Sequence, residues 1–511
     1  MHIEIVHQCL ETQAKKHARK KFLFFNEDTY TYSEVNKRAN KLSALLSEKG
    51  LQKGDRVAIM LENSPEFFFS YFAILKAGAI VVPVNTFLKQ EEVAYMVNDS
   101  GSKFFITSQS FDYVAAGITE HCSELQAVMA FTETSFDSEN IFVASEDKPD
   151  SNPETIISTD DLALFIYSSG TTGHPKGAML THFNLTSNAQ GCCARFKISV
   201  KDRFLLFLPA FHSYAMMTCV VLPTYVVSSI IILGSVNDLK KKTFKKILLY
   251  KRPTFFLGVP QVYIALIKSK MPKFFIKFLY PIRLHVSGGA PLPEEILDQF
   301  RAKFNKPIIE VYGLSEASPV VSANSLKVQK PLSVGPALKD VEVLVVDENE
   351  KAVPVGEVGE LIVKGPNVMK GYWNMPELTQ KTLRNGWLFT GDLAKVDKEG
   401  YIYIVDRIKD LIIVKGINVY PREIEEVLHK HEKVEAAAVI GLPDKSSGEI
   451  PVAYVKIKDD VEATEKELKT YLKEHLANYK LPKHIHMETD LPMTATGKIL
   501  KRELKDKVLN G

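Results

Sequence analysis

The stretch DRVAIMLENSPEFFFSYFAILKAGAIVVPV, residues 55–84, decides the fold class. Its two ends, DRVAIML and AIVVPV, are nearly continuous apolar runs. Between them, NSPEFFFSYFAILKAG has Ser64 at a helix N-cap position, Pro65 in the first turn and Gly78 after the last turn. Strands without polar alternation are buried on both faces, which is typical of parallel sheets joined by crossover helices. The stretch therefore predicts a strand–helix–strand unit of an α/β protein.

The surrounding sequence predicts two domains. Beyond about residue 330 the apolar runs alternate with polar residues and turn signals, which predicts a small antiparallel β module. The expected fold is α/β, with a large N-terminal domain of parallel and mixed sheets with helices (1–408, including the β module at about 330–408) and a small mobile α+β C-terminal domain (409–511). Further strands are expected at KFFIT (103–107), IIILG (230–234), TFFLGV (254–259), RLHVSGG (283–289), IIEVYG (308–313), EAAAVIGL (435–442) and IPVAYVKI (450–457).

Composition and charge are those of a soluble globular protein. The 511 residues are 45% hydrophobic and 24% charged, and the formal charge is +3. The five cysteines are scattered without a CxxC pair, and the N-terminus lacks the apolar run of a secretory signal, so we expect a cytoplasmic protein. Residues 204–237 carry no charged side chain, but Pro209 and Pro223 interrupt them, which predicts a core helix and strand rather than a membrane span.

A glycine-rich loop, YSSGTTGHPKG (167–177), predicts a phosphate-binding site. It is not a Walker loop, because Pro175 occupies the second glycine position and Gly177 stands where a magnesium-binding serine or threonine is needed. Small residues nevertheless let backbone N–H groups converge on phosphate oxygens, and Lys176 adds a positive charge. The alternative is a polar surface loop.

Five further motifs follow the loop in order: VSGGAPL (286–292), VYGLSEASP (311–319), GWLFTGD (386–392), YIVDRIKDLIIVKGINVYPREIE (403–425) and PMTATGKILKREL (492–504). Together with the loop they resemble the acyl-adenylate-forming superfamily, which includes acyl-CoA synthetases, the adenylation domains of peptide synthetases, and firefly luciferase. The chain looks most similar to bacterial medium- and long-chain fatty-acyl-CoA synthetases. The resemblance implies a ligase that uses ATP, Mg²⁺ and CoA to convert a fatty acid to acyl-AMP and then to acyl-CoA.

The resemblance also implies a nucleotide site. Tyr312 would lie against adenine, the alternative being a core tyrosine, and Asp392 would accept hydrogen bonds from the ribose hydroxyls, the alternative being a turn residue. Glu316 and Thr171 would hold Mg²⁺, and Arg407 would contact the ribose or the α-phosphate. The remaining nucleotide-binding residues would be Ser168, Ser169, Gly170, Thr172, Gly173 and Lys176 in the loop, Gly288, Gly289, Ala290 and Pro291 beside adenine, and Gly313 and Ser315 in the third motif.

The expected catalytic residues are Lys498, His212 and Glu316. An ammonium group at Lys498 would stabilise charge that develops between the attacking carboxylate and the leaving pyrophosphate. Because Lys498 lies thirteen residues from the C-terminus, it reaches the nucleotide only if the small domain closes over the large one, with a hinge at Lys409. In a second closure Gly416 would line the CoA channel, whereas His212 has the alternative of a satisfied core histidine. We expect the neighbouring Lys501 and Arg502 to be surface charges.

The acid substrate is expected to be an apolar monocarboxylic acid. The predicted pocket wall (212–217, 258–263, 288–290 and 318–321) contains no charged residue that could pair with an amino group or a second carboxylate. The sequence does not distinguish a fatty acid from an aryl acid as the substrate. Two other functions also remain: a fatty-acyl-AMP ligase that loads a carrier protein, and a non-catalytic nucleotide- or membrane-binding scaffold.

A basic segment suggests a lipid partner. No acidic residue occurs between Leu239 and Pro293, whereas twelve lysines and arginines occur between residues 239 and 283, and within KSKMPKFFIKFLYPIR (268–283) lysines alternate with aromatic residues. One hypothesis is peripheral contact with an anionic membrane, on its inner face. The alternative is a solvated lysine-rich face. No nucleic-acid partner is expected, and the sequence leaves the oligomeric state open.

Overall fold

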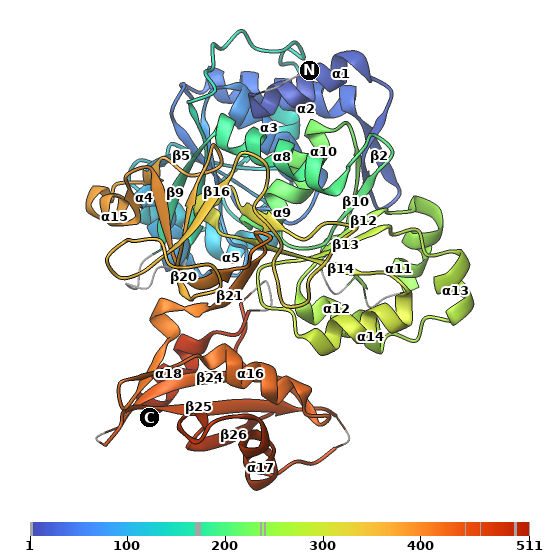
Figure 1. Ribbon diagram of the computed structural model, residues 1–511. Coiled ribbons are helices and arrows are strands. Elements are labelled where there is room, and N and C mark those ends of the chain that lie inside the picture. Colours follow the sequence, from blue (N-terminus) through green and yellow to red (C-terminus); the bar gives the residue numbers. More distant parts are fainter. Residues whose placement is uncertain are drawn as a thin grey trace.

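The computed structural model describes residues 4–168, 175–235, 238–239, 242–444, 446–459, 461–494 and 498–509. Two large mixed sheets form the body of the molecule (Figure 1). The first has the strand order β18 (Gly371–Tyr372), β9 (Lys176–Thr181), β8 (Leu162–Ser168), β4 (Ile80–Pro83), β3 (Arg56–Ile59), β5 (Ser102–Thr107), β6 (Ala127–Ala130) and β7 (Glu139–Asn140). The second has the order β15 (Val320–Ala323), β14 (Ile308–Gly313), β13 (Leu284–Ser287), β12 (Phe255–Gly258), β10 (Arg203–Leu206), β11 (Ser229–Ile232), β1 (Lys21–Phe25) and β2 (Asp28–Thr31).

The predicted strand–helix–strand unit is confirmed. β3 and β4 pair in parallel, with Arg56 opposite Ile80, and helix α3 (Pro65–Lys76) connects them. Ser64 holds the extended N-cap backbone but its side chain makes no capping hydrogen bond, while Gly78 has the left-handed φ of +77° that ends the unit.

Helix α3 lies in the middle of the large domain. Every side chain from Phe67 to Lys76 is buried, as expected for a helix that is apolar all round. Phe68 reaches Phe22 of the second sheet, with ring centroids 6.0 Å apart, so the helix joins the cores of both sheets. The one charged residue of this run, Lys76, is neutralised by Glu11 of α1 (Val6–Lys16) at 2.5 Å.

The uncharged stretch also folds as predicted. After β10, residues 213–225 form a continuous helical segment (α9, η2 and α10) that is almost entirely buried, and β11 follows. None of the helices in the described part of the chain has both the length and the apolar character needed to span a bilayer.

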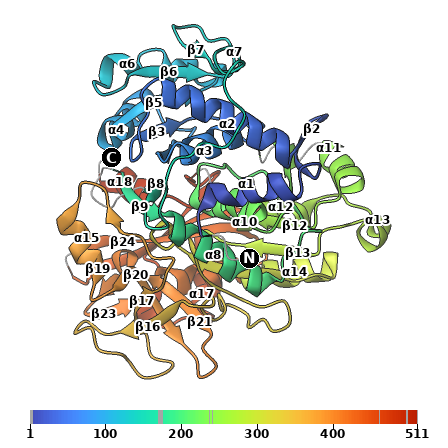
Figure 2. The same cartoon turned by 90° about the horizontal axis from the view of Figure 1, so that it is seen from above.

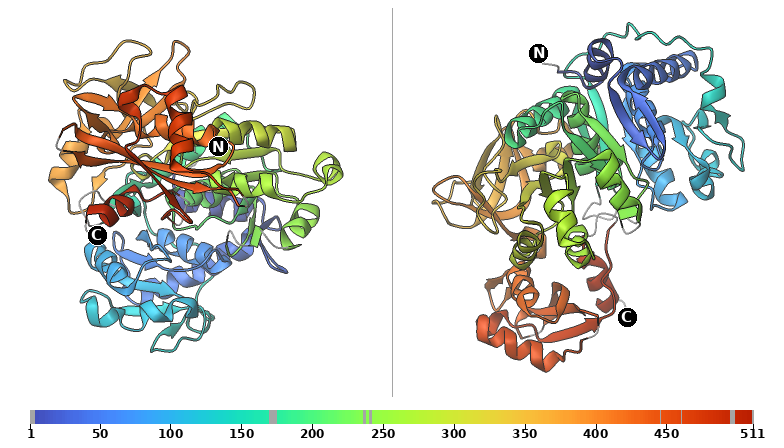
Figure 3. Two further views of the ribbon diagram at one scale, coloured as in Figure 1. Left: turned by 90° about the horizontal axis from the view of Figure 1, so that it is seen from below. Right: turned by 90° about the vertical axis from the view of Figure 1, so that its right-hand side faces the viewer.

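The two smaller sheets follow in the chain. The β module is antiparallel, as expected, and contains β16 (Glu342–Val346), β17 (Gly359–Lys364), β19 (Leu383–Arg384), β20 (Trp387–Val396) and β21 (Ile402–Arg407). The C-terminal part forms a separate lobe (Figure 3) with its own core. Its elements are β22 (Ile412–Val414), β23 (Ile417–Val419), α16 (Pro421–Lys430), β24 (Val434–Asp444), β25 (Gly448–Ile457), α17 (Glu465–His475), β26 (His484–Glu488) and α18 (Lys501–Leu509).

Helices pack against the faces of both large sheets (Figure 2), and some of them lie with α3 in the core between the sheets. They pack through the apolar faces that the sequence gives them, such as Val35, Ala39, Leu42 and Leu46 of α2. The longer ones not yet named are α2 (Tyr32–Glu48), α4 (Gln90–Ser100), α8 (His182–Phe196), α12 (Pro260–Lys268) and α14 (Glu294–Phe304).

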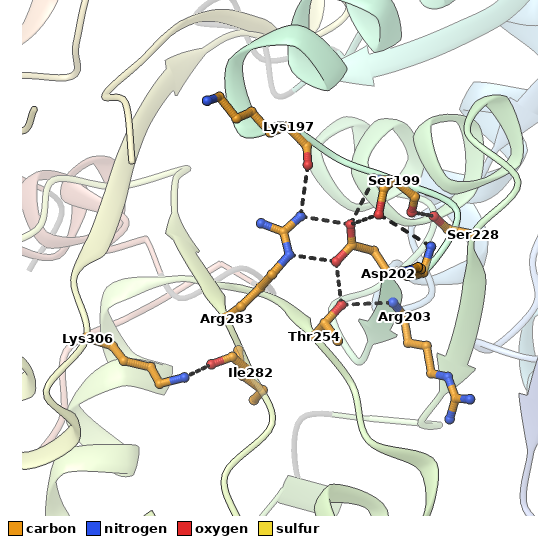
Figure 4. Close-up of polar contacts among 10 residues, drawn as sticks. Lys197, Ser199, Asp202, Arg203, Ser228, Thr254, Ile282, Arg283 and Lys306 are labelled. Carbon is orange, nitrogen blue, oxygen red and sulfur yellow. Dashed lines mark hydrogen bonds and ion pairs between the residues drawn. The ribbon is translucent and has the colours of Figure 1, made fainter. Parts of the chain in front are cut away.

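An ion pair ties the N-terminal ends of three strands in the second sheet (Figure 4). Arg283, just before β13, donates to both carboxylate oxygens of Asp202, just before β10, at 2.7 Å each. Thr254, just before β12, donates to the same carboxylate at 2.7 Å. This bidentate pair fixes the N-terminal ends of these strands relative to one another. The candidate site described below lies at their opposite, C-terminal ends.

One buried histidine makes this core sensitive to acid. His285 of β13 is enclosed by aromatic rings, stacking on Tyr280 and contacting Phe300, and neither ring nitrogen has a hydrogen-bond partner among the described residues. Burial, followed by the charge of Lys306, lowers the pKa of His285 to about 3. The folded protein therefore keeps this ring neutral while the unfolded chain takes up a proton below about pH 6.5.

We predict that His285→Phe reduces acid destabilisation. Because the folded pKa is depressed, stability is lost as the pH falls from about 6.5 toward 3, and at pH 5 this costs about 2 kcal/mol. The gain in unfolding free energy from the substitution, measured by urea titration, should thus be about 2 kcal/mol larger at pH 5 than at pH 7. The same substitution at exposed His17 is the control. An equal effect of His285→Phe at both pH values would contradict the account.

Candidate active site

The predicted site residues gather at one edge of the second sheet, where parallel strands β10, β12 and β13 end beside β14. The loops after these ends carry His212, Gly288 and the segment that begins at Tyr312. Gly288 packs so tightly that a Cβ atom would lie 2.7 Å from Val311 and 3.2 Å from Tyr214. A larger residue at position 288 would displace these side chains. Ala290 is half-buried and Pro291 exposed in the same loop, in which Gly289 has a φ of +81°.

Asp392 is the centre of the site. Its carboxylate, on β20, accepts a hydrogen bond of 2.6 Å from the hydroxyl of Tyr312, at the end of β14. Its other oxygen pairs with Nε of Arg407 at 3.2 Å, because β20 and β21 place these two residues opposite each other. Asp392 is only 5% exposed. Burial, and then this carboxylate, raise the pKa of Tyr312 well above its usual value, so the phenol remains a donor.

Gly313 shapes the turn that follows Tyr312. A Cβ atom there would lie 2.1 Å from the carbonyl oxygen of Pro319, which accepts a hydrogen bond from the Leu314 N–H. Only glycine permits this close approach of two backbone segments. The turn directs Ser315 and Glu316 toward the loops of the neighbouring strands.

The glycine-rich loop connects β8 to β9 as a hairpin in which Ser168 lies opposite Lys176. Ser169, Gly170, Thr171, Thr172 and Gly173 lie outside the described residues. The base of the hairpin is fixed by Tyr167, which packs on Gly177 and donates to Asp99 at 2.6 Å. The ends of the predicted phosphate loop are therefore set at the edge of the first sheet.

Tyr372 links this hairpin to Glu316, and sequence reasoning missed it. Its ring lies 5.7 Å from Nζ of Lys176, and its hydroxyl donates to Oε1 of Glu316 at 2.8 Å. β18 brings Tyr372 to this place by pairing with β9 across almost two hundred residues. In the sequence Tyr372 is marked only by the neighbouring aromatic residue in GYW (371–373), and this pair belongs to no motif that would indicate a functional role.

His212 lies beside the same cluster. Its Nδ1 accepts a long 3.3 Å hydrogen bond from the Tyr214 N–H at the start of α9, and burial lowers the pKa of His212 to about 4, so the ring is neutral at pH 7. The next residue, Ser213, shares a 3.0 Å hydrogen bond with Ser315. This bond joins the loop after β10 to the segment that carries Glu316.

Lys498, from the small domain, lies within electrostatic range of Asp392 and Arg407. The carbonyl oxygen of Lys498 accepts a 2.8 Å hydrogen bond from the Thr494 N–H. Burial, and then the charges of Arg407 and Lys409, lower the pKa of Lys498 to about 8, while Asp392 opposes this shift. Arg407, Lys409 and Asp392 therefore lie near enough to the ammonium group of Lys498 to change its pKa.

The connection between the two domains is held by buried polar groups. Asp406, next to Arg407, accepts hydrogen bonds from the backbone N–H groups of Arg407 and Arg422, and the Arg422 side chain donates to the carbonyl of Ile404 at 2.6 Å. Lys409 lies in the following short turn. Lys501 is not the free surface charge expected from the sequence, because it pairs with Glu425 of α16 at 2.8 Å. Arg502 is largely exposed.

Gly416 is not brought to the cluster. It lies in the turn between β22 and β23 with a φ of +79°, and the space where a Cβ atom would project is open. The hydrogen bonds of this hairpin run to Ser447 and Glu449 within the small domain. The predicted place of Gly416 in the CoA channel belongs to a second closure and stays a prediction.

Comparison with known proteins identifies the chain. Residues 10–373 match the AMP-binding enzyme family, and residues 423–498 match the AMP-binding enzyme C-terminal domain. The chain belongs to the AMP-binding enzyme family. It is 36% identical to a long-chain-fatty-acid–CoA ligase of Bacillus subtilis (97% of this chain, 93% of the relative). It is also 36% identical to a feruloyl-CoA synthase of Amycolatopsis (93% of each). The enzyme is thus an acyl-adenylate-forming ligase, and membership of this family supports binding of ATP and CoA.

The structure superposes on solved structures of relatives over nearly its whole length. The crystal structure of ATP-bound MatB from Rhodopseudomonas palustris superposes with a TM-score of 0.90 (32% identity, 98% of this chain and 99% of that one). The apo form of the same protein superposes with a TM-score of 0.81 (32% identity, 99% and 98%).

The described residues fit a magnesium ion that is held mainly by the nucleotide. They contain no group of three or more histidine, cysteine, aspartate or glutamate side chains that could form a complete metal site. Mg²⁺ commonly takes one or two carboxylates and completes its shell with phosphate oxygens and water. Glu316 offers such a carboxylate. The hydroxyl of Tyr372 donates a hydrogen bond to it, and the ring of the same tyrosine lies beside Nζ of Lys176.

We predict that Tyr372→Phe weakens adenylation. The variant keeps the ring beside Lys176 but removes the hydroxyl that orients Glu316, a hydrogen bond to a charged group that contributes about 1.5–3 kcal/mol. Pyrophosphate release should fall at least about tenfold in kcat/KM, and the Mg²⁺ concentration for half-maximal rate should rise. Tyr403→Phe, which removes a tyrosine hydroxyl from Asp397 in the β module, is the matched control. An unchanged Mg²⁺ dependence would refute the role of Tyr372.

Proposed function

We propose that the enzyme activates an apolar monocarboxylic acid, in the first place a fatty acid, and transfers it to CoA. The acid and ATP give acyl-AMP and pyrophosphate, and CoA then gives acyl-CoA and AMP. The observation that carries the proposal is that Lys498 of the small domain interacts electrostatically with Asp392 and Arg407 of the large domain, which form an ion pair next to Tyr312. A reaction that needs the nucleotide enclosed between two domains accounts for this interaction.

The nucleotide would lie between these residues. Asp392 would accept from the ribose hydroxyls with the lone pairs that Tyr312 and Arg407 leave free, since each carboxylate oxygen has two. The ring of Tyr312 would lie against adenine, with Gly288, Gly289, Ala290 and Pro291 on its other side. Lys176 and the loop that it ends would hold the phosphates, and Arg407 would lie near the α-phosphate. Enclosure of the ATP between the two domains would exclude water from acyl-AMP.

In the first step a carboxylate oxygen of the acid attacks the α-phosphorus, and the bond to pyrophosphate breaks. Lys498 would place its ammonium group where negative charge is shared between the attacking and leaving oxygens. His212, neutral at pH 7, would border the carboxylate without repelling or neutralising it. Mg²⁺ would be held by Glu316 and Thr171 and would neutralise charge on the phosphates.

In the second step the sulfur of CoA forms a bond to the acyl carbon while the bond to AMP breaks and the thiol loses its proton. Lys498 has then finished its part, and the small domain would rotate about Lys409 to bring the Gly416 turn to the acyl group. The open space around Gly416 would let the thin pantetheine arm pass close to the backbone. A cytoplasmic supply of ATP and CoA fits this sequence of steps.

The acid class follows from the pocket wall and the relatives. Tyr214, Met216, Met217 and Val259 are all buried, and the wall offers no charge to pair with a second ionised group of the substrate. The Bacillus relative supports a fatty acid, and the equally similar feruloyl-CoA synthase supports an aryl acid as the second candidate. Buried Tyr214, packed against Gly288, would suit either chain or ring.

A panel of acids distinguishes the remaining possibilities. The enzyme is incubated with ATP, Mg²⁺ and CoA and with octanoate, dodecanoate, palmitate, ferulate or malonate, and AMP and the acyl products are quantified. We expect acyl-CoA with the highest kcat/KM for one of the fatty acids and no turnover of malonate. Preference for ferulate would establish the aryl-acid alternative. Acyl-adenylate without acyl-CoA would indicate a ligase that loads a carrier protein, and no AMP from any acid would indicate a non-catalytic scaffold.

A further inference from the structure

Helix α13 (Lys273–Phe278) has an unusual outer face. Phe274 and Phe278 are 66% and 63% exposed, and their ring centroids lie 5.2 Å apart. Lys273 and Lys277 are exposed beside them, whereas Ile276 points inward and is buried. Residues i and i+4 lie on the same side of a helix, so the outer face repeats a lysine–phenylalanine pair on two successive turns. An ordinary surface helix directs its large apolar residues to the core instead.

Much of the basic segment is not free to join this face. Arg283 is used by Asp202 within the large domain (Figure 4), and Lys268 pairs with Glu435 of the small domain at 2.9 Å. The side chains of the lysines at 240–242 lie outside the described residues. The basic surface is therefore smaller than the sequence predicts. Among the described residues it consists of the lysines around α13 and those of the neighbouring segment.

The remaining basic and aromatic side chains lie at one edge of the molecule. Lys270 is exposed just before α13, and Tyr250, at the end of the segment that starts with α11 (Lys242–Lys246), is 77% exposed. Figures 1 and 2 place α11 and α13 at the same outer edge, away from the small domain. We call Lys270, Lys273, Phe274, Lys277 and Phe278 the α13 patch.

We propose that the α13 patch docks the enzyme on the surface of an anionic lipid bilayer. Aromatic rings gain by leaving water for the boundary between headgroups and acyl chains, and lysines on either side keep their charges at the level of the headgroups. The absence of acidic side chains from residue 239 to 293 favours negatively charged lipid over a neutral surface. Charge complementarity and exposed aromatics thus point to the same partner.

The position of the patch suits a substrate that arrives from the membrane. Helix α12 begins at Pro260, in the predicted acid-pocket wall, and ends at Lys268, next to the patch. At 1.5 Å per residue this helix is about 14 Å long. This connection rests on the proposed function, because only an apolar acid would be stored in the bilayer. Docking itself does not depend on it and is measured without substrates.

Vesicle binding tests the proposal. The full-length protein is sedimented with vesicles of phosphatidylglycerol and phosphatidylcholine, and with phosphatidylcholine vesicles alone, at physiological salt. We expect binding to the anionic vesicles only. Phe274→Ser with Phe278→Ser should lower the partition coefficient at least about tenfold. Lys273→Gln with Lys277→Gln should lower it about fivefold per lysine and reduce its salt dependence.

Matched controls come from the same chain. Tyr113 is also 66% exposed, and Lys466 and Lys473 are exposed on α17 of the small domain. Tyr113→Ser, and Lys466→Gln with Lys473→Gln, should leave vesicle binding unchanged. All variants should keep their circular dichroism spectra, since the substituted side chains are exposed.

Three results would overturn the proposal. The first is no binding to anionic vesicles, and the second is an equal loss of binding in the control variants. The third is a concentration-dependent dimer, seen by sedimentation velocity without lipid, that the phenylalanine variants abolish, because the patch would then bind a second copy of the chain. Vesicle binding by a protein that activates none of the acids in the panel would refute the proposed function and leave the docking proposal intact.

Discussion

The Asp392 carboxylate organises the site. It lies almost fully out of water between the hydroxyl of Tyr312 and the guanidinium of Arg407, which come from the second large sheet and from the last strand before the small domain. Removing either partner would leave a buried charge partly uncompensated, which is costly. The same carboxylate acts on the ammonium of Lys498 across the domain boundary. One charged group thus connects the second large sheet, the β module and the small domain.

The fold could be predicted from the sequence wherever short-range patterns determine it. The continuous apolar strands and the capped helix of residues 55–84 specify a parallel unit, and the alternating runs of the β module specify an antiparallel one. The uncharged stretch after Phe204 was interpreted correctly because its prolines and β-branched residues favour a core helix and strand. Local patterns cannot give the orientation of a whole domain, on which the predicted role of Gly416 depends.

The motifs of the candidate site could be recognised in the sequence, whereas the contacts that support them could not. Tyr372 reaches Glu316 only because β18 pairs with β9, and Ser213 reaches Ser315 only because two strand ends meet. Lys501, expected from the sequence to be a surface charge, pairs with Glu425 of α16 in the structure. Each of these contacts joins segments far apart in the chain, where no spacing rule applies. The chemistry of the reacting groups could therefore be inferred from residue types, whereas their orientation required the three-dimensional structure.

The most direct test of the account separates the two steps in the Lys498→Ala variant. Pyrophosphate release from ATP and a fatty acid is measured in one assay, and formation of acyl-CoA from supplied acyl-adenylate and CoA in another. The account predicts that the first rate falls about 100- to 1000-fold while the second is unchanged, because the ammonium group acts only while pyrophosphate departs. An unaltered first rate, or an equal loss in both, would contradict the central role of Lys498 beside Asp392.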